Sequence, residues 1–573
     1  MLLPRYATLA ALLVIFCACS DQSATPNSSE LAKPAAAAPS AGGLFADVTS
    51  ASRIDFVHHA GGSGKKYIVE TMGAGAAVLD FDSDGYMDLY VLESGRIPGT
   101  DTVVEPGTNK LYRNRGDGSF DDVTEKAHAV GSGYGQGVIA GDYDNDGDAD
   151  LYLLNFGANV LLRNNGDGTF ADVTAAAGVG DSSWSVSGAF FDAEPDGDLD
   201  IFVVNYLDFT VAKHRPCGKL TEGKVSTCHP DVYRHSADRF YRNRGDGTFE
   251  DASADSGLVD VDGKGLGLGI ADFVGNDGLP DIYVANDSTP NQLYRNLGGG
   301  KFEEQGVWLG CSHNDDGKTE AGMGVATGDV NNDGNIDVYV TNLSMETNAL
   351  YLGSGEEFTY ATRIAGLHAP TLVNLGFGNN LTDFDNDGDL DIFTANGHVM
   401  DDTQDLNEIT RYRQPHQVLF NNGKAVFTEL SAAQKGDVAE PRVGRGSVVI
   451  DYDNDGRQDM FVMHNIDRAR LFKNQSAASG HWIGFSLKGI QCNRAAVGAR
   501  ITLQTTQGTQ VREVMAGGSY ASSNDPRLHF GLGSESSIQK LTIRWPGGSV
   551  QELGPLATDR YWTVVEGSAP AAR

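Results

Sequence analysis

The stretch Asp142-Tyr-Asp144-Asn-Asp146-Gly147-Asp-Ala-Asp150 runs directly into the apolar residues 151–154, Leu-Tyr-Leu-Leu. Variants of this pattern, Asp-x-Asp-x-Asp-Gly-x-x-Asp followed by a short apolar run, occur seven times in the 573 residues of the chain. Carboxylates at alternate positions of a tight loop can turn toward one centre, and glycine at position six takes a conformation that a side chain would resist. The repeat therefore predicts both a cation held by oxygen ligands and a ring of similar units.

Calcium is the cation that this pattern indicates. It accepts about six to eight oxygens in irregular cages, whereas magnesium requires a stricter octahedron and zinc favours His or Cys, which the loops lack. An EF-hand would need Glu at position twelve and a helix beyond it. The twelfth residues lie instead in runs that predict buried strands, namely Val91, Leu153, Val203, Val340, Thr394 and Val462. We therefore expect the loops to join strands.

The expected calcium ligands occupy positions one, three, five and nine of each loop. In the six regular copies they are Asp80, Asp82, Asp84 and Asp88; Asp142, Asp144, Asp146 and Asp150; Asp192, Glu194, Asp196 and Asp200; Asp329, Asn331, Asp333 and Asp337; Asp383, Asp385, Asp387 and Asp391; and Asp451, Asp453, Asp455 and Asp459. The fourth copy along the chain has one extra residue and carries Val274 where a ligand is expected, which leaves Asp272, Asp277 and Asp281. We expect about six or seven Ca²⁺ sites, the one at residues 272–281 being weak or empty.

The alternative interpretation is that these loops are solvated acidic turns without metal. Seven copies in the same strand context disfavour it. The formal charge of the chain is −34, much of it in the loops, so bound Ca²⁺ would offset a large part of it. Because so acidic a protein repels phosphates, we expect no nucleic-acid partner.

Each loop belongs to a larger repeat of four short strands. Around the loop quoted first, strands are predicted at residues 137–142, 150–155, 160–164 and 169–174, joined by tight turns. Such units, repeating about every fifty residues or more, describe propeller blades. The seventh unit lacks its last strand, Phe-x-Asp-Val-Thr, and residues 45–49 supply it. The predicted fold is an all-β, seven-bladed β-propeller closed by its N-terminal strand, with six or eight blades as alternatives, followed by a small β domain.

These repeats resemble the FG-GAP and VCBS repeats of integrin-α-like propellers. After the propeller, the motifs 493–500 (Asn-Arg-Ala-Ala-Val-Gly-Ala-Arg), 517–522 (Gly-Gly-Ser-Tyr-Ala-Ser), 529–533 and 543–548 resemble an ASPIC/UnbV domain. The pairing is similar to the cartilage-acidic-protein-like family over about residues 44–567. That resemblance implies calcium binding, export and interaction rather than a known reaction. We expect a propeller over residues 44–475, a compact β domain over 480–567 and a tail at 568–573.

The N-terminus is typical of a bacterial export signal over residues 1–18. Arg5 precedes an apolar stretch, and Ala18-Cys19 at its end resembles a lipobox, which implies cleavage before Cys19 and its acylation. Ordinary cleavage nearby is the alternative, because Phe16 and Cys17 are imperfect lipobox residues. Ser20 resembles the sorting residue of outer-membrane lipoproteins, facing the periplasm or the exterior. Residues 19–43 are expected to form a flexible tether.

Four cysteines follow Cys19. Cys217 and Cys228 close a small loop, and the oxidising compartment implied by export favours a disulfide between them. Cys311 and Cys492 lie in different regions, and either a second disulfide or two thiols fits the sequence.

The links between second and third strands are expected on the face opposite the calcium loops. A polar residue begins each link, either capping the turn or forming a polar ring around the central channel: Glu93, Asn155, Asn205, Asn286, Asn342, Asn396 and His464. Long insertions at residues 94–108, 206–239 and 397–415 lie on the same face. Because binding is usual in long loops on a rigid scaffold, we expect the partner there.

Function is less determined than fold. The chain has no nucleophile-elbow, zinc or phosphate-loop motif. We predict a non-enzymatic, calcium-binding envelope lipoprotein that binds a polysaccharide or an envelope or extracellular protein through its loop-rich face. One alternative is a lyase-like, polysaccharide-active enzyme, with a base and cations from His398, His416, Arg411 and Arg413. Another is a structural subunit of an outer-membrane assembly.

Overall fold

A computed structural model describes residues 42–101, 107–258, 262–403, 409–477, 480–506 and 508–573. The predicted signal segment, Cys19 and the tether up to residue 41 lie outside these residues. Helices in the described part are short: α1 (Thr174–Ala177), α2 (Ser253–Ser256), α3 (His368–Thr371), α5 (Ala432–Lys435), and the 3₁₀ turns η1 (Ile68–Thr71), η2 (Val211–Lys213), η3 (Leu220–Glu222), η4 (Pro230–Val232) and η5 (Asp437–Ala439). None of them is long and apolar enough to cross a membrane.

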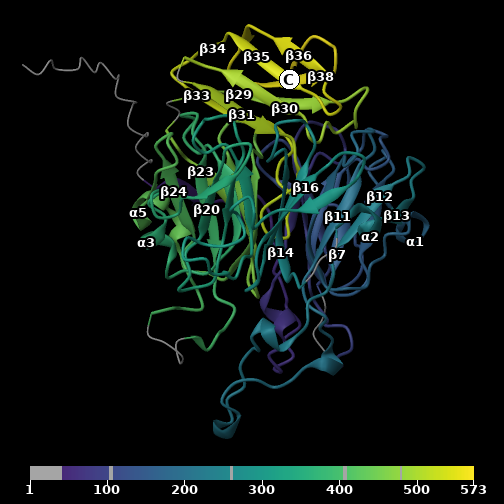
Figure 1. The fold of residues 1–573 in the computed structure, drawn as a ribbon, viewed down its shortest axis with the longest axis vertical. Coiled ribbons are helices and arrows are strands. Elements are labelled where there is room, and N and C mark those ends of the chain that lie inside the picture. Colours follow the sequence, from purple (N-terminus) through teal and green to yellow (C-terminus); the bar gives the residue numbers. More distant parts are fainter. Residues whose placement is uncertain (1–41, 102–106, 259–261, 404–408, 478–479, 507) are drawn as a thin grey trace, which may run out of the picture. The chain divides into compact units, whose positions relative to one another are not determined.

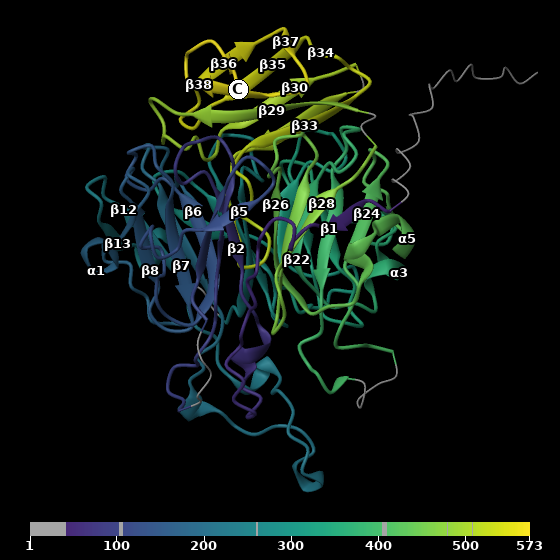
Figure 2. The same cartoon turned by 180° about the vertical axis from the view of Figure 1, so that it is seen from behind.

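Seven antiparallel sheets form the propeller blades in chain order (Figures 1 and 2). Blades 1 to 4 are β2 (Ala76–Leu79), β3 (Asp88–Val91), β4 (Lys110–Asn114), β5 (Phe120–Asp122); β6 (Gly135–Gly141), β7 (Asp150–Asn155), β8 (Val160–Asn164), β9 (Phe170–Asp172); β10 (Ser185–Phe191), β11 (Asp200–Asn205), β12 (Arg239–Asn243), β13 (Phe249–Asp251); and β14 (Gly265–Ala271), β15 (Asp281–Asn286), β16 (Gln292–Asn296), β17 (Phe302–Glu304). Blades 5 to 7 are β18 (Val325–Gly328), β19 (Asp337–Val340), β20 (Ala349–Gly353), β21 (Phe358–Tyr360); β22 (Gly376–Thr382), β23 (Asp391–Asn396), β24 (Gln417–Asn421), β25 (Phe427–Glu429); and β26 (Gly444–Ile450), β27 (Asp459–His464), β28 (Arg470–Asn474) with β1 (Phe45–Asp47).

The burial of each strand follows from its place in the blade. Second strands such as β7 and β11 are buried at every residue, because both of their faces pack against neighbouring blades. The outermost strands are covered on one side only, so in β9 Phe170 is buried whereas Asp172 is exposed. The apolar runs that follow each candidate calcium loop in the sequence are therefore the core of the ring.

The predicted closure of the ring is confirmed. β1 pairs antiparallel with β28, Phe45 standing opposite Asn474 and Asp47 opposite Phe472. The N-terminal strand thereby becomes the fourth strand of blade 7 and covers an edge that would otherwise be open to another chain.

In six of the seven blades an asparagine at the end of the third strand fastens the blade to the one before it. Asn164 in blade 2 donates from Nδ2 to the backbone oxygen of Phe81 in the loop of blade 1 (2.9 Å). Equivalent bonds come from Asn114, Asn243, Asn296, Asn421 and Asn474. In blade 5 Gly353 stands at this position. Most of the acidic loops predicted to bind calcium are therefore held from two blades at once.

The C-terminal domain consists of two four-stranded sheets and a two-stranded ribbon. The first sheet has the order β33 (Leu528–Gly533), β29 (His481–Lys488), β38 (Tyr561–Val565) and β39 (Ala571–Ala572); the second has β31 (Thr509–Glu513), β30 (Arg500–Gln504), β35 (Lys540–Arg544) and β36 (Val550–Leu553); and β34 (Ser537–Ile538) pairs with β37 (Leu556–Ala557). Residues 568–573, predicted to be a tail, include β39 and so belong to the domain.

The expectation of a self-contained β domain is wrong in one respect, because residues 515–527 leave the domain and enter the propeller (Figure 1). Within them β32 (Ala516–Gly517) pairs with β10 as a fifth strand of blade 3. Ala521 accepts the N–H of Val138, and Ser523 that of Val78. A Cβ at Gly75 would lie 1.7 Å from the oxygen of Ala521, so only glycine permits this approach. We call residues 515–527 the axial segment.

Candidate functional site

The first aspartate of each candidate calcium loop organises the turn. Asp142 accepts the N–H of Asp146 on Oδ1 (3.1 Å) and that of Gly147 on Oδ2 (2.9 Å). Gly147 has φ of 101°, which a side chain would oppose. The same two bonds recur at Asp80, Asp192, Asp329, Asp383 and Asp451. The loop is thus shaped by its own carboxylate, which keeps lone pairs for a cation.

The aspartate at position nine has a second role that the sequence did not reveal. Asp150 is fully buried and accepts the N–H of Asn164 on Oδ1 (2.7 Å) and that of Tyr143 on Oδ2 (3.1 Å). The bond to the third strand recurs at Asp88, Asp200, Asp281, Asp337, Asp391 and Asp459. These aspartates fasten the loop to the blade, whether or not they also ligate a cation.

Four loops bring three carboxylates together, with ligand atoms within 4.8 Å of one another: Asp80, Asp82 and Asp88; Asp142, Asp144 and Asp146; Asp383, Asp385 and Asp391; and Asp451, Asp453 and Asp455. The loops at 192, 272 and 329 form no such group among the described residues. Buried oxygens without a hydrogen-bond partner include Oδ1 of Asp82, Asp144 and Asp453 and Oδ2 of Asp459. A cation would satisfy them, so these residues fit Ca²⁺.

Burial changes the acidity of the loop carboxyls in the metal-free protein. It raises the pKa of Asp142, Asp192 and Asp451 to about 7 each, and that of Asp281 to about 8. Burial also raises the pKa of Asp88, Asp150 and Asp337 well above its ordinary value. Without a cation, part of this acidic set is therefore protonated near neutral pH.

Basic residues of the third strands lie against several loops. Arg113 of β4 donates to Asp82 (2.5 Å) and Asp84 (2.8 Å). Arg242 of β12 pairs with Glu194 (2.5 Å), and Lys473 of β28 pairs with Asp453 and Asp455. They offset part of the loop charge from the side of the blade.

The C-terminal domain lies on the same face of the ring as the candidate calcium loops (Figures 1 and 2). Tyr561 donates to Asp451 (2.8 Å) in blade 7, and Arg573 to Asp80 (3.1 Å) in blade 1. Further contacts join Arg494 to Asn145, His529 to Asn386 and Arg527 to Asn454. Sequence reasoning missed this docking, although arginines in the motifs after the propeller complement an acidic repeat.

The irregular fourth loop receives an arginine from that domain. Arg544 Nη2 lies 2.6 Å from Oδ2 of Asp272, which is 5 % exposed. Beside it Arg500 pairs with buried Glu513 (3.2 Å), and Glu513 Oε2 accepts the N–H of Asp272. An arginine of the C-terminal domain therefore lies against Oδ2 of this aspartate, which also accepts the N–H of Gly278, while Oδ1 of Asp272 is buried without a hydrogen-bond partner.

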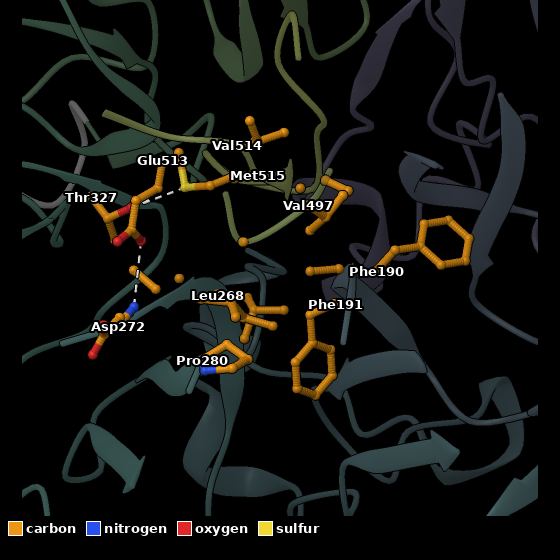
Figure 3. A pocket seen from close by; sticks show the side chains of 18 of the residues that line it. Phe190, Phe191, Leu268, Asp272, Pro280, Thr327, Val497, Glu513, Val514 and Met515 are labelled. Carbon is orange, nitrogen blue, oxygen red and sulfur yellow. Dashed lines mark hydrogen bonds between the residues drawn. The ribbon is translucent and has the colours of Figure 1, made fainter. Parts of the chain in front are cut away.

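An apolar cavity of about 70 Å³ separates the inner strands of blades 3 to 5 from residues 513–519. Figure 3 shows Phe190, Leu268 and Pro280 on the propeller side and Val497 and Met515 on the domain side. Its polar contacts, Thr327 with Met515 and Asp272 with Glu513, are already satisfied within the protein. The cavity is a gap in the interface between propeller and domain, and among its described lining residues Oδ1 of Asp272 is a buried oxygen without a hydrogen-bond partner.

The five asparagines among the recurring polar residues of the opposite face bond the backbone of nearby loops, whereas Glu93 accepts from His59 and His464 lies against His416. Asn155 donates to the backbone oxygens of Ser132 and Ala158, and Asn396 to that of Pro415. Asn205, Asn286 and Asn342 donate to loop carbonyls in the same way. The axial segment pairs with the inner strands in the middle of the ring, and the bonds of these asparagines favour the capping interpretation over a polar ring around the central channel.

Three long insertions extend from this opposite face (Figures 1 and 2). The second carries η2, η3 and η4, and its tip is closed by a disulfide between Cys217 and Cys228. At its base Trp184 packs edge-on against Tyr206 (5.1 Å) and Phe156 (5.5 Å). Cys311 and Cys492 are both free thiols.

The residues considered for a lyase each have a structural partner. His416 is fully buried, and its Nε2 lies 3.0 Å from Nε2 of His464. Burial lowers the pKa of His416 to about 3 and that of His398 to about 4. Arg413 pairs with Asp467 (3.0 Å), and Arg411 donates to the oxygen of Thr410. No shared arrangement of base and cations emerges from these contacts.

Two known protein families match different parts of this chain. Residues 80–153, 142–203, 274–340, 329–394 and 383–462 match the FG-GAP-like repeat, and together they cover more than half of the chain. Residues 489–571 match the ASPIC and UnbV domain.

Named relatives agree with these matches. Cartilage acidic protein 1 of Xenopus tropicalis is 28% identical over 324 residues, which are 54% of this chain and 45% of that protein. The Mus musculus protein is 28% identical over 334 residues, 56% of this chain and 48% of the relative. The chain thus spans about half the length of the curated relatives it matches.

Solved propellers are more distant. An Agrocybe aegerita lectin that recognises non-reducing terminal N-acetylglucosamine has a TM-score of 0.38 at 17% identity, covering 64% of this chain and 82% of that chain. Bacillus licheniformis rhamnogalacturonan lyase PL11 has a TM-score of 0.32 at 13% identity, covering 87% and 91%. Likeness at this level supports no inference about ligand or activity.

Proposed function

Because the chain belongs to the cartilage-acidic-protein-like family of FG-GAP repeat proteins with an ASPIC and UnbV domain, we propose that it is a non-enzymatic, calcium-binding protein of the bacterial envelope. Ca²⁺ holds the loops of the propeller, and the loop-rich face binds a polysaccharide or a protein partner.

One observation carries the calcium proposal. Each of four loops brings three carboxylates together, with ligand oxygens within 4.8 Å of one another, and several oxygens of these loops are buried without a hydrogen-bond partner. Unpartnered buried oxygens are costly, and an oxygen-seeking cation removes that cost. Ca²⁺ would also neutralise the like charges in each loop. At a dissociation constant near 10⁻⁴ M, millimolar calcium contributes roughly 1.4 kcal/mol per site by mass action.

The partner-binding proposal rests on the solvent exposure of the insertions on the opposite face. The calcium-loop face is covered by the C-terminal domain, whereas the insertions of the opposite face extend into solvent. In the second insertion Leu220 is 51% and Val225 40% exposed, within the loop that the Cys217–Cys228 disulfide closes. Apolar side chains on a tip held by a disulfide suit a contact surface.

Export and anchoring complete the proposal. The lipobox-like Cys19 would carry the lipid, and residues 20–43 would separate the propeller from the outer membrane. An oxidising compartment agrees with the disulfide of the second insertion.

The experiment is retention of the chain from residue 20 onward on immobilised acidic and neutral polysaccharides, in calcium and in chelator. Its variants are Leu220→Asp with Val225→Asp on the insertion and, as the matched control, Val550→Asp on the C-terminal domain, where Val550 is 63% exposed. Calcium-dependent retention that the insertion variant loses and the control keeps supports the proposal. Retention that survives the insertion variant rules out this face, and no retention on any polymer turns the search to a protein partner by crosslinking on cells.

A further inference from the structure

A second, larger cavity lies beside blades 1 and 2, whereas the cavity described above lies beside blades 3 to 5. It has a volume of about 560 Å³ and separates the calcium loops of blades 1 and 2 from the C-terminal domain. Asp80, Ser83 and Asp142 line it from the propeller, and Ser486, Lys488 and Thr563 from the domain. Ligand pockets of about 300–1,000 Å³ commonly hold molecules of drug or oligosaccharide size.

The alternation of side chains along β29 and β38 explains why the domain side of this cavity is polar. β29 and β38 run parallel and in register, with Ser486 opposite Thr563 and Lys488 opposite Val565. The intervening Phe485 and Val564 point into the core of the domain and are fully buried. Ser486, Lys488 and Thr563 therefore share the other face of the sheet, which is the face toward the propeller.

That same face touches the propeller at blade 7 and leaves a space over blades 1 and 2. Tyr561, two residues before Thr563, donates to Asp451 (2.8 Å). Trp482 packs against Gly456, where an added Cβ would lie 1.8 Å from the indole. The sheet is thus held at blade 7 by Tyr561 and Trp482 and at blade 1 by Arg573, which donates to Asp80 (3.1 Å), so the cavity is a feature of the docked domain.

Positively charged side chains line one side of the cavity, and carboxylates of the loops line the other. The former are Lys488, Arg494, Arg527 and Arg573, and the latter are Asp80, Asp142 and Asp146. Arg527 pairs with Asp525 (2.6 Å) and Arg573 with Asp80 (3.1 Å), which leaves Lys488 and Arg494 to face a ligand. Lys488 is exposed and makes no ion pair with any described residue. Cations in the two loops would offset their carboxylates and leave the lining positive, with the hydroxyls of Ser83, Ser486 and Thr563 beside it.

We propose that this cavity binds an acidic oligosaccharide, whose carboxylate meets Lys488 and Arg494 and whose hydroxyls meet the serine and threonine side chains. A carboxylate pairs with these cations by charge-assisted hydrogen bonds, and the mixed lining of hydroxyl and apolar groups suits a sugar ring. The site is separate from the insertion face. It rests on the proposed function only for the cations that offset Asp80 and Asp142.

The test is isothermal titration of the chain from residue 20 onward with trigalacturonate, in 1 mM Ca²⁺ and in chelator. Maltotriose, a neutral sugar, and citrate, a carboxylate without a sugar, serve as comparison probes. The variant is Lys488→Glu, and the matched control is Lys424→Glu, an exposed lysine in a turn of blade 6. We expect trigalacturonate to bind, maltotriose and citrate to bind at least about tenfold more weakly, and Lys488→Glu to lose about tenfold in affinity at an unchanged melting temperature.

Absence of trigalacturonate binding, or equal affinity in the Lys488→Glu and Lys424→Glu proteins, would overturn the inference. Citrate binding as tight as trigalacturonate binding would overturn the sugar class. Loss of binding in the Leu220→Asp, Val225→Asp protein instead would move the site to the insertion face. Calcium binding is measured separately, by the shift in melting temperature that Ca²⁺ causes. If Ca²⁺ causes no shift but trigalacturonate still binds and Lys488→Glu abolishes that binding, the calcium proposal fails and the oligosaccharide site stands.

Discussion

Arg544 of the C-terminal domain lies 2.6 Å from Asp272, in the loop whose third position is occupied by Val274 instead of an oxygen ligand. The loop that has an apolar residue at a ligand position is thus the one whose aspartate pairs with an arginine of the C-terminal domain. The positive charge of this arginine offsets the negative charge of the buried carboxylate, and the same contact fastens the domain to blade 4.

Replacing this arginine tests that assignment. Arg544→Gln leaves Asp272 buried without its cationic partner, so we expect a loss of about 2 kcal/mol in the free energy of unfolding. Chemical denaturation in chelator measures it. Lys540→Gln on the same strand is the control, since its pairing with Glu552 is exposed, and equal stability of the two variants would mean that Arg544 contributes nothing special.

The axial segment should be central to the stability of the ring. Tyr520 is 1% exposed, lies 4.9 Å from the ring of Phe377 and donates to the oxygen of Met72 (3.3 Å). Tyr520→Ala removes this packing in the middle of the ring, and we expect a loss of about 3 kcal/mol or more in thermal or denaturant unfolding. Trp308→Ala, which removes an aromatic side chain that is 88% exposed, should cost less than about 0.5 kcal/mol. A Tyr520→Ala protein as stable as that control would show that the segment is not packed as described.

The stability of the metal-free protein should fall as pH rises from about 6.5 to 8. Burial raises the pKa of Asp142, Asp192 and Asp451 to about 7 and that of Asp281 to about 8. A raised carboxyl pKa stabilises the fold at low pH, and this contribution disappears as pH passes the folded-state pKa. Below about pH 6.5 the buried histidines act in the opposite direction, because burial lowers the pKa of His58, His416 and His529 to about 3.

Thermal melts in chelator and in 1 mM Ca²⁺ at pH 6.5, 7.2 and 8 measure this dependence. Because Ca²⁺ binds the ionised carboxylates, the calcium-induced rise in melting temperature should grow with pH. A rise that shrinks with pH would contradict carboxylate ligation.

Much of the ring could be predicted because its signals are local and repeated. The acidic loop, the apolar run after it and the missing last strand of the seventh unit gave the blade count and the pairing of β1 with β28. The axial segment carries no comparable period: its Gly-Gly-Ser-Tyr-Ala-Ser run is explained only by the narrow space between inner strands. The double role of Asp150 and the partner of Arg544 depend on contacts between distant residues, which no local pattern encodes.

The most direct test of the account is the number of calcium ions bound by the chain from residue 20 onward, counted by equilibrium dialysis. We predict six for the unaltered protein, one for each regular loop, because the fourth loop has Val274 at a ligand position, and five for Asp144→Ala, which removes a carboxylate of the blade 2 loop. Glu356→Ala, at an exposed turn outside the loops, should still bind six. Absence of bound calcium, or an unchanged count in Asp144→Ala, would contradict the account.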